Sequence, residues 1–226
     1  MCFFVIIFGM KDTRLNLLKI SARIFARKGY SGTSVRDIAK AAHINVSAIA
    51  YYFGGKRELF FETIRYLIEQ HRKEVWGTQF AIPTTEQVTH YSYQQALDLL
   101  HQMFDKLLDN GLNRRNLPLE RIFTQVELES TDMRKMLLTY VAPFHELPYK
   151  LLEKLTGLPE QSAEMLCVTH TIFGQIWLSQ SHRLVIEHKL GVTKNYPPEL
   201  REKIKKTLWA HTLAVLNLYK KETKQG

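Results

Sequence analysis

Apolar residues recur along most of the chain at spacings of three and four, the period of an amphipathic helix. The first such segment runs from Lys11 to Lys28 and is followed by Gly29, in the position that glycine favours just past a helix. A second, short segment begins after Thr33 and Ser34, which are candidates for its N-cap. A third runs from Asn45, itself a cap candidate, to Phe53. The pattern therefore predicts one long helix followed by two short ones.

Helical periodicity continues through the rest of the chain. It predicts helices over Arg57 to Trp76, Tyr91 to Asn110, a shorter piece ending at Glu129, Thr131 to Leu155, Gln161 to Leu190 and Pro198 to Lys220. The segment from Gly77 to His90 is predicted to be a loop. Pro143 and Pro148 are predicted to kink or divide the helix in which they lie. Because no segment has the alternation typical of a strand, the sequence predicts an all-α protein.

Positive charge is concentrated near the N-terminus. The chain of 226 residues has a formal net charge of +9. Between Lys11 and Arg57 ten Lys or Arg stand against two acids, so this segment carries +8 and the remainder only 9 − 8 = +1. A basic module on a nearly neutral body favours a polyanionic partner, either nucleic acid or an anionic membrane surface. Two cysteines are too few for a disulfide framework, which favours a reducing, cytoplasmic setting.

Residues 1–8, MCFFVIIF, form a short apolar run. The run is far shorter than the about 20 residues that span a bilayer, and it lacks the basic leader and cleavage site of a secretory signal. Since Met10 directly precedes a good helix, residues 1–10 are interpreted as an N-terminal extension, of which the first nine come from an upstream start. No membrane association is expected.

The second and third predicted helices are joined by a tight turn of four residues, which is typical of a helix-turn-helix unit. Ala39 is small where the two helices must cross closely. Val46, Ile49 and Phe53 are predicted to face the core of the unit. The remaining positions of the third helix are then predicted to face outward: Ser47, Ala48, Ala50 and Tyr51. An ordinary three-helix bundle without a ligand is the alternative, but charge, capping and turn spacing agree on a DNA-binding module.

The run GYSGTSVRDIAKAAHINVSAIAYYFGGKRELF resembles the N-terminal DNA-binding module of TetR-type transcriptional repressors. The resemblance covers residues 11–75, and beyond residue 90 it is weak. It implies a homodimer that places the helix from Asn45 to Phe53 in the major groove of a palindromic operator. Two positions depart from the family pattern: His43 replaces the usual turn glycine, and Ala50 replaces a frequent aromatic residue.

The resemblance also implies roles for individual residues. Thr33 and Ser34 would cap the preceding helix and hold phosphate, Tyr52 and Lys56 would hold phosphate, and Tyr51 would lie near the backbone or a base. Helix N-termini and hydroxyl groups are natural phosphate holders, because their N–H and O–H groups point at the anion. The first turn of the second helix carries Arg36, which is a further phosphate candidate or equally a solvated surface arginine. The full set of candidate DNA-binding residues is Thr33, Ser34, Arg36, Asn45, Ser47, Ala48, Ala50, Tyr51, Tyr52 and Lys56.

The division expected from these patterns is a DNA-binding domain over residues 11–56 and a ligand-sensing and dimerisation domain over residues 57–226. In the family, a small-molecule inducer binds among the later helices. The resemblance implies an inducer here too, whose identity the sequence does not give. The candidate ligand-binding residues are Phe123, Tyr140, Phe144, His145, Phe173 and Trp177, with Gln125 and Gln175 as further polar groups. These aromatic residues are also typical of an ordinary helical core.

The last two predicted helices are the candidates for a homodimer contact, as family analogy implies. Their apolar positions include Leu166, Ile172, Phe173, Ile176, Trp177, Leu208, Leu213 and Leu216. Packing within one chain is the alternative use of the same residues.

Enzyme functions find little support in the sequence. Asp98, His101 and Asp105 share a helical face like metal ligands, but they border an apolar stripe and are better explained as its solvated edge. No phosphate-binding glycine loop or nucleophile elbow is present, and neither a catalytic residue nor a cofactor is predicted. The sequence thus predicts a ligand-responsive transcriptional repressor that binds double-stranded DNA. The alternatives are a helical small-molecule- or metal-binding protein that does not act on DNA, and a membrane-surface binder.

Overall fold

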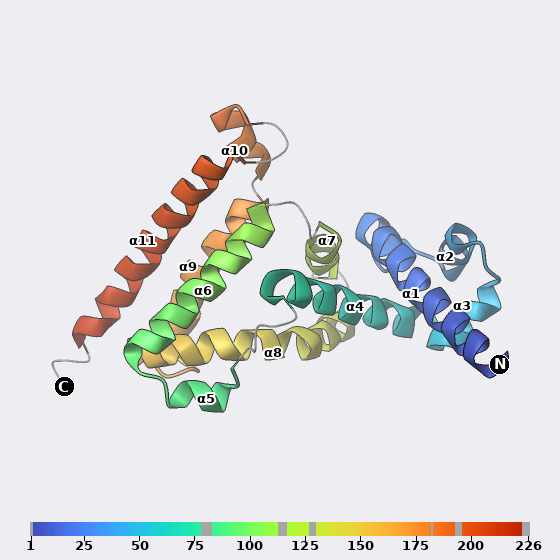
Figure 1. Ribbon diagram of the computed structural model, residues 1–226, viewed down its shortest axis with the longest axis horizontal. Coiled ribbons are helices and arrows are strands. Elements are labelled where there is room, and N and C mark those ends of the chain that lie inside the picture. The colour runs from blue at the N-terminus through green and yellow to red at the C-terminus, as the bar shows by residue number, and fades with distance from the viewer. Residues whose placement is uncertain are drawn as a thin grey trace. The chain divides into compact units, whose positions relative to one another are not determined.

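The computed structural model describes residues 2–77, 83–112, 117–126, 130–181, 183–192 and 196–222. Within these ranges it leaves undescribed the side chains of residues 2–11, 117, 136, 140–141, 143–144, 179–181, 183–184 and 220–222. Every regular element in the described part of the chain is a helix, as Figure 1 shows. The helices are α1 (Cys2–Lys28), α2 (Val35–Ala42), α3 (Val46–Phe53), α4 (Lys56–Trp76), α5 (Thr85–Thr89), α6 (Tyr93–Leu112), α7 (Leu117–Val126), α8 (Thr131–Thr156), α9 (Ala163–Ser181), α10 (Arg183–Leu190) and α11 (Pro198–Glu222).

The chain divides into two compact units. Unit 1 comprises residues 1–73 and 116–140, and unit 2 comprises residues 74–115 and 141–226. Unit 1 thus holds α1, α2, α3, most of α4, α7 and the first part of α8. The functional boundary expected after residue 56 stays a prediction. In the structure, α4 supplies core residues to unit 1 well beyond residue 56.

The core of unit 1 is built around aromatic side chains from α1 and α4. Phe25 and Phe60 are fully buried, and their ring centroids lie 4.8 Å apart in an edge-to-face arrangement. Each buried phenylalanine contributes roughly 1.5–3 kcal/mol relative to an exposed one. Ile38 of α2 and Ile49 of α3 are also buried in this cluster. The two short helices are therefore held by the long ones rather than by their own length, since isolated helices of eight residues are unstable in water.

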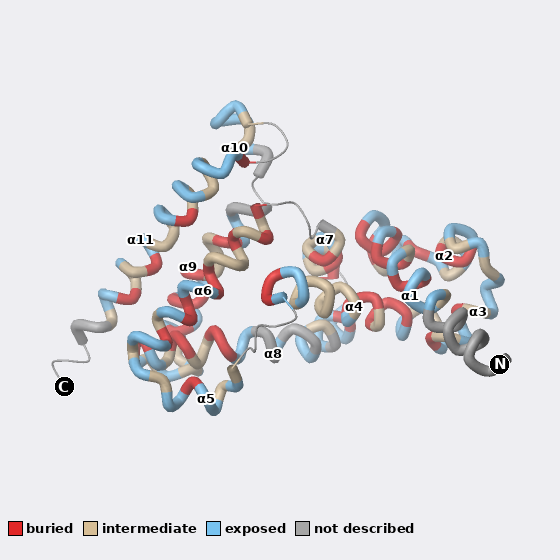
Figure 2. The backbone as a smooth tube through the Cα atoms, viewed as in Figure 1, coloured by how far each residue is buried: buried red, intermediate tan, exposed pale blue. Residues whose placement is uncertain are grey.

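Unit 2 has its own apolar core, formed by α6, α8, α9 and α11. Its most deeply buried members include Leu100, Phe104, Leu151, Leu152 and Ile172. Figure 2 shows buried positions recurring along one side of α11 while exposed positions occupy the other. This is the distribution that the sequence periodicity predicts for an amphipathic helix.

One charged residue is drawn into the contact between α6 and α11. The Lys205 side chain is 11% exposed, and its Nζ lies 3.1 Å from Asp109 Oδ2 and 3.8 Å from Asp105 Oδ1. Burial alone would lower the pKa of Lys205, but the carboxylates outweigh it and the pKa is raised. Asp105 is therefore used to pair with a lysine of a neighbouring helix.

Three of the predicted elements are corrected by the structure. The predicted loop from Gly77 to His90 contains α5, which begins at a capping box between Thr84 and Gln87. The predicted helix from Gln161 to Leu190 is two helices, α9 and α10. The first helix begins at Cys2 rather than at Lys11.

The prolines of α8 do not divide the helix. Pro143 and Pro148 remove two backbone N–H donors, yet α8 is continuous from Thr131 to Thr156. Leu147, Leu151 and Leu152 are buried in the core of unit 2, and this packing holds the helix past Pro148. None of the described helices is long and apolar enough to span a membrane.

Candidate DNA-binding surface

Helix α2 begins at a fully formed capping box. Ser34 is its N-cap: the Ser34 hydroxyl accepts from the Asp37 backbone N–H at 3.1 Å, and Asp37 Oδ2 accepts from the Ser34 backbone N–H at 3.0 Å. The Asp37 carboxylate also lies 3.3 Å from Lys28 Nζ. These contacts fix the first turn of α2, on which Arg36 is exposed. The predicted capping role of Ser34 is confirmed.

Thr33 lies differently from Ser34. Its side chain is buried, and Oγ1 donates to the carbonyl oxygen of Gly29 at 2.7 Å. The hydroxyl therefore stabilises the connection between α1 and α2. Its phosphate contact stays a prediction, which this burial disfavours.

The turn between α2 and α3 consists of the three residues after Ala42, one fewer than predicted. His43 adopts the left-handed conformation, with φ 55° and ψ 42°, and its N–H closes the end of α2 on Ala39 O and Lys40 O. This conformation normally favours glycine, because a Cβ crowds the backbone there. The expectation that His43 must tolerate the backbone of a turn glycine is confirmed.

Helix α3 is capped by Asn45 and anchored by two apolar side chains. Asn45 Oδ1 accepts from both the backbone N–H and the hydroxyl of Ser47, each at 2.9 Å. Ile49 and Phe53 are buried, as predicted. Gly54 ends the helix in the left-handed region, with φ 86°.

The opposite face of α3 is open to solvent. Ser47 and Ala50 are exposed and Tyr51 is 73% exposed, whereas Ala48 is half-buried. Val46 was predicted to face the core and is instead 39% exposed. The reason is positional: helical side chains lean toward the N-terminus, so Val46 at the start of α3 extends over the preceding turn rather than over the core. The outward face is therefore formed by Val46, Ser47, Ala50 and Tyr51, two pairs separated by one helical turn.

Spacing alone assigned Val46 to the core, and periodicity offers no signal that separates it from Ile49. The available signal was its place directly after the cap residue Asn45. First-turn residues of a recognition helix have no preceding turn to pack on.

Only Gly54 and Gly55 separate the end of α3 from the start of α4. Lys56, its first residue, places Nζ 4.2 Å from the centroid of the Tyr30 ring, within the range of a cation–π contact. Tyr52 is half-buried and its ring lies 5.2 Å from that of Tyr51. The Tyr52 ring and the Lys56 ammonium thus lie at the C-terminal end of α3 and just beyond it.

The candidate ligand-binding residues are not gathered into one place. Phe123 packs against the core of unit 1, and Phe173 packs against the core of unit 2. Trp177 is 56% exposed, and His145 is also exposed. The side chains of Tyr140 and Phe144 lie outside the described residues.

The three residues weighed as metal ligands serve other contacts. The His101 ring stacks on Trp209 with centroids 4.1 Å apart, and Asp98 accepts from Gln94. The described residues contain no group of three His, Cys, Asp or Glu side chains arranged to hold a metal ion.

One long helix and two short ones around a shared core, with a capped third helix whose outer face is open, define a helix-turn-helix module. Residues 17–63 match the family model described as bacterial regulatory proteins, tetR family. The N-terminal module of this chain is therefore similar to that of TetR-family regulators.

The chain is similar to curated proteins that are named HTH-type transcriptional regulators or repressors. The protein named "Probable HTH-type transcriptional regulator YttP" from Bacillus subtilis (strain 168) is 31% identical over 132 residues, which are 58% of this chain and 58% of that protein. The "HTH-type transcriptional repressor KstR2" of Rhodococcus jostii (strain RHA1) is 28% identical over 132 residues, 57% of this chain and 63% of that protein. The chain thus spans less than two thirds of the length of these relatives.

Solved structures share the fold over most of the chain. HlyIIR, a hemolysin II transcriptional regulator, matches with a TM-score of 0.54 at 16% identity and covers 87% of this chain and 97% of its own. AibR in complex with isovaleryl coenzyme A and operator DNA matches with a TM-score of 0.57 at 13% identity, covering 87% and 95%. At such low identity these matches show a common helical fold.

Proposed function

We propose that the chain is a DNA-binding transcriptional regulator that represses transcription from a palindromic operator and is released by a small-molecule inducer. The observation that carries this proposal is the exposed face of α3, formed by Val46, Ser47, Ala50 and Tyr51 on a helix anchored by Ile49 and Phe53. An exposed apolar and hydroxyl face of this kind has little use in a bundle without a partner. In a major groove it contacts base edges.

Phosphate contacts supply most of the affinity in this proposal. The N-terminus of α2 at Ser34, the Arg36 guanidinium, the Tyr52 hydroxyl and the Lys56 ammonium would bind the DNA backbone on either side of α3. Lys and Arg that neutralise phosphates release counterions, which makes binding strongly salt-dependent. The balance of +8 between Lys11 and Arg57 supports this role.

Base recognition would rely on close approach rather than on long polar side chains. Val46, Ala50 and Tyr51 can pack against thymine methyl groups, and Ser47 can donate or accept at several bases. Direct readout of this kind is modest. DNA shape and the spacing between two half-sites would therefore complete the specificity.

A homodimer through α9 and α11 would supply that spacing. Of the apolar positions expected there, Leu166 and Trp177 are 50% and 56% exposed, whereas Ile172, Ile176 and Leu216 are buried within unit 2. Exposed tryptophan is costly in water and typical of an interface core. Gly174 lies one turn before Trp177, and a Cβ added there would meet nothing within 4 Å in the single chain. A glycine that its own chain does not require would allow a partner helix to approach closely.

An inducer site within unit 2 is supported by Gln175 on α9. Both polar atoms of its side-chain amide are buried and have no hydrogen-bond partner among the described residues. An unpaired buried amide destabilises the folded protein by about 1–3 kcal/mol. A ligand that forms hydrogen bonds with the amide would remove this penalty and so bind more tightly. The AibR complex, which holds both isovaleryl coenzyme A and operator DNA, is a precedent for a small molecule and DNA bound by one protein of this fold. The inducer would prefer a conformation in which the two recognition helices no longer match successive major grooves. We place such a regulator in the cytoplasm, where its DNA lies.

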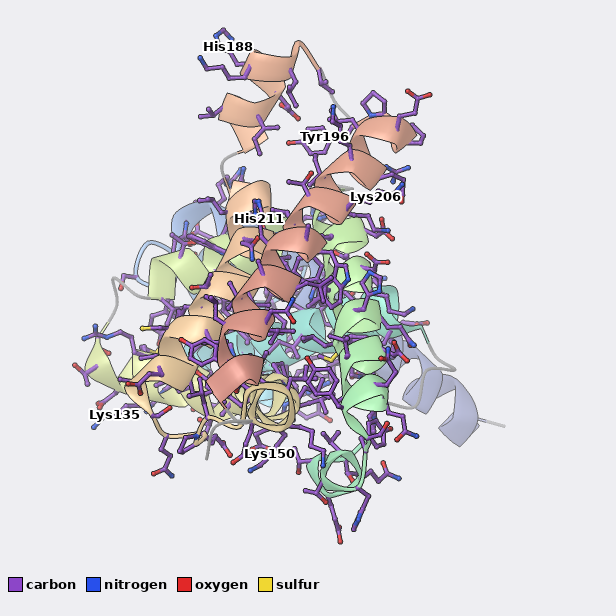
Figure 3. The ribbon with its side chains drawn as sticks, turned by 90° about the vertical axis from the view of Figure 1, so that its left-hand side faces the viewer. Lys135, Lys150, His188, Tyr196, Lys206 and His211 are labelled. Carbon is purple, nitrogen blue, oxygen red and sulfur yellow. The ribbon has the colours of Figure 1, made fainter. Side chains whose placement is uncertain are left out.

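Fluorescence anisotropy with a duplex from upstream of the chain's own gene tests the proposed function. The control is a shuffled duplex of the same length and composition, and both are titrated at several salt concentrations. We expect tighter binding to the genuine duplex, lost in Tyr51→Ala and kept in Lys206→Ala, whose side chain is exposed on α11 (Figure 3). Equal affinity for both duplexes at every salt concentration would overturn the proposal.

A further inference from the structure

A cleft of about 350 Å³ lies between α1 and α7 within unit 1. It is lined by Arg23, Ile24, Ala26 and Arg27 of α1 and by Pro118 and Arg121 of α7. In Figure 1, α7 lies beside the C-terminal end of α1, on the other side of that helix from α2. None of the lining residues belongs to α2 or α3. The cleft is thus separate from the outward face of α3.

The three arginines of the cleft repel one another electrostatically. Arg23 and Arg27 are one helical turn apart on α1, where like charges repel, and Arg121 faces them from α7. Among the residues that the structure describes, none of the three guanidiniums forms an ion pair or a hydrogen bond. This is unlike Arg14, which pairs with Glu62 at 2.6 Å, and Arg72, which pairs with Glu69 at 2.8 Å. The cleft therefore carries three positive charges without a matching acid.

The acid that lies nearest in sequence does not neutralise this charge. Glu120 directly precedes Arg121 but is not among the lining residues. Burial raises the pKa of Glu120, and no cation opposes the shift. An arginine paired with this carboxylate would lower its pKa instead.

The beginning of α7 adds to the positive potential. Pro118 borders the cleft and lies in the first turn of α7, a helix of ten residues. The N-terminus of a helix carries partial positive charge, which favours a nearby anion, although Pro118 itself has no N–H to donate.

Gln125 provides a second polar feature next to the cleft. It lies one turn after Arg121, and its Nε2 donates to the carbonyl oxygen of Ala26 at 3.3 Å. Its Oε1 is buried without a partner among the described residues. Because Ala26 O is an acceptor, the amide nitrogen must face it, and Oε1 is left to accept from a donor that the chain does not supply.

We propose that the cleft between α1 and α7 is a binding site for a phosphate-bearing small molecule. Three guanidiniums match a phosphate monoester or diphosphate, which carries two or more negative charges, better than a single carboxylate. A volume of about 350 Å³ accommodates a small phosphate ester and falls at the lower end of ordinary ligand sites. The bound anion would bridge α1 to α7 and remove the repulsion between the arginines.

The test measures the melting temperature of the full chain with inorganic phosphate, pyrophosphate or ribose 5-phosphate, each against sodium chloride at equal ionic strength. Binding at about five times Kd raises the Tm by roughly 2–4 °C for a chain of this size. The Arg23→Gln, Arg27→Gln, Arg121→Gln triple variant should lose this rise. A matched variant with the same loss of charge on exposed lysines, Lys189→Gln, Lys203→Gln, Lys206→Gln, should keep it. A larger shift with ribose 5-phosphate than with pyrophosphate identifies a phosphate ester as the ligand class, and the reverse order identifies a free diphosphate.

No DNA is present in this measurement, so its result is independent of the proposed function. Equal shifts in the two triple variants, or no shift with any of the three anions, overturn the site. If only the salt dependence of DNA binding differs between the two variants, the arginines contact the DNA backbone instead and the proposal fails. Should the cleft variant not fold, Arg121→Gln alone, at an exposed position of α7, carries the same test with a partial loss expected.

Discussion

The ammonium of Lys56 lies 4.2 Å from the centroid of the Tyr30 ring. This contact joins the first residue of α4 to the connection between α1 and α2. A cation–π contact at a partly exposed site contributes about 0.5–1 kcal/mol and restricts a side chain that would otherwise be mobile. The geometry therefore presents the Lys56 charge in a defined position near the end of α3.

Replacing Lys56 by alanine should weaken binding to all DNA sequences to a similar extent. Each lost phosphate contact lowers the slope of log K against log salt by about 0.9 per subunit. Anisotropy titrations across several salt concentrations measure this slope directly.

Two further variants separate charge from packing at this position. Tyr30→Leu removes the ring but keeps the ammonium, so it should lower affinity with a smaller change in salt slope. Lys206→Ala removes one exposed charge from α11 and should leave the slope unchanged. An unaltered slope in Lys56→Ala would exclude this lysine from the DNA contact.

The left-handed backbone of His43 makes a prediction about stability. A non-glycine residue in this conformation is strained by roughly 1–2 kcal/mol, whereas glycine adopts it freely. Glycine relieves this strain, but it also gains entropy in the unfolded chain, which offsets part of the benefit. His43→Gly should therefore raise the free energy of unfolding by a net ~0.5–1 kcal/mol. Urea unfolding followed by circular dichroism measures the change. Ala42→Gly, one residue earlier and still helical, should destabilise by about 1 kcal/mol, and a loss of the same size in both variants would show that the turn is not strained.

The capping box of α2 should make stability depend on pH below about 4. Hydrogen bonds from the Ser34 backbone and hydroxyl, together with Lys28, lower the pKa of Asp37 below its ordinary value of 3.8. A carboxyl with a depressed pKa in the folded state contributes stability above its unfolded pKa, and loses it as pH falls through the folded pKa. The Tm of the wild type should therefore fall more steeply between pH 5 and pH 3 than that of Asp37→Asn. Glu199→Gln, an exposed acid on α11, serves as the control and should follow the wild type; parallel curves for all three would exclude the contribution of Asp37.

The helical pattern predicted the DNA-binding module well because local chemistry decides it. Ser34, Asn45 and Gly54 are caps whose side chains or backbone freedom act within a few residues, so their roles can be read from neighbouring letters. The inward positions Ile49 and Phe53 follow from helical spacing. Val46 shows where this reasoning fails, because exposure at a helix end depends on what the rest of the fold places beyond it.

Unit 2 was harder to predict because tertiary packing overrides local signals there. Pro148 is a helix breaker in isolation, but Leu147, Leu151 and Leu152 bury enough apolar surface to keep α8 continuous. The division of α9 from α10 has no glycine or proline to mark it in the sequence. Whether an aromatic residue such as Trp177 lines a pocket, a core or an interface depends on which neighbours reach it.

Gly174 tests the proposed dimer contact through α9. In a single chain a Cβ at position 174 meets nothing within 4 Å, and Gly174→Leu improves helix propensity by about 0.5–1 kcal/mol, so we expect the folded subunit to be retained, as circular dichroism would check. If a partner helix approaches this glycine closely, the leucine should convert the dimer to a monomer, as sedimentation velocity would detect. Gln102→Leu on α6 adds a comparable exposed leucine away from the proposed contact and should stay dimeric. A dimer of unchanged stability in Gly174→Leu would place the interface elsewhere.

Gln175→Leu distinguishes a ligand-binding amide from a packing defect. Both polar atoms of Gln175 are buried without a hydrogen-bond partner among the described residues, so replacing the amide by an apolar side chain of similar size should raise the free energy of unfolding by about 1–3 kcal/mol. If the amide serves an inducer, the stabilised variant should still bind operator DNA but no longer be released by cell metabolite extracts that release the wild type. Ile172→Val, one turn away in the same core, controls for general repacking and should destabilise by roughly 0.5–1.5 kcal/mol while keeping its response. A Gln175→Leu protein that is stabilised and released like the wild type would show that the amide does not contact the inducer.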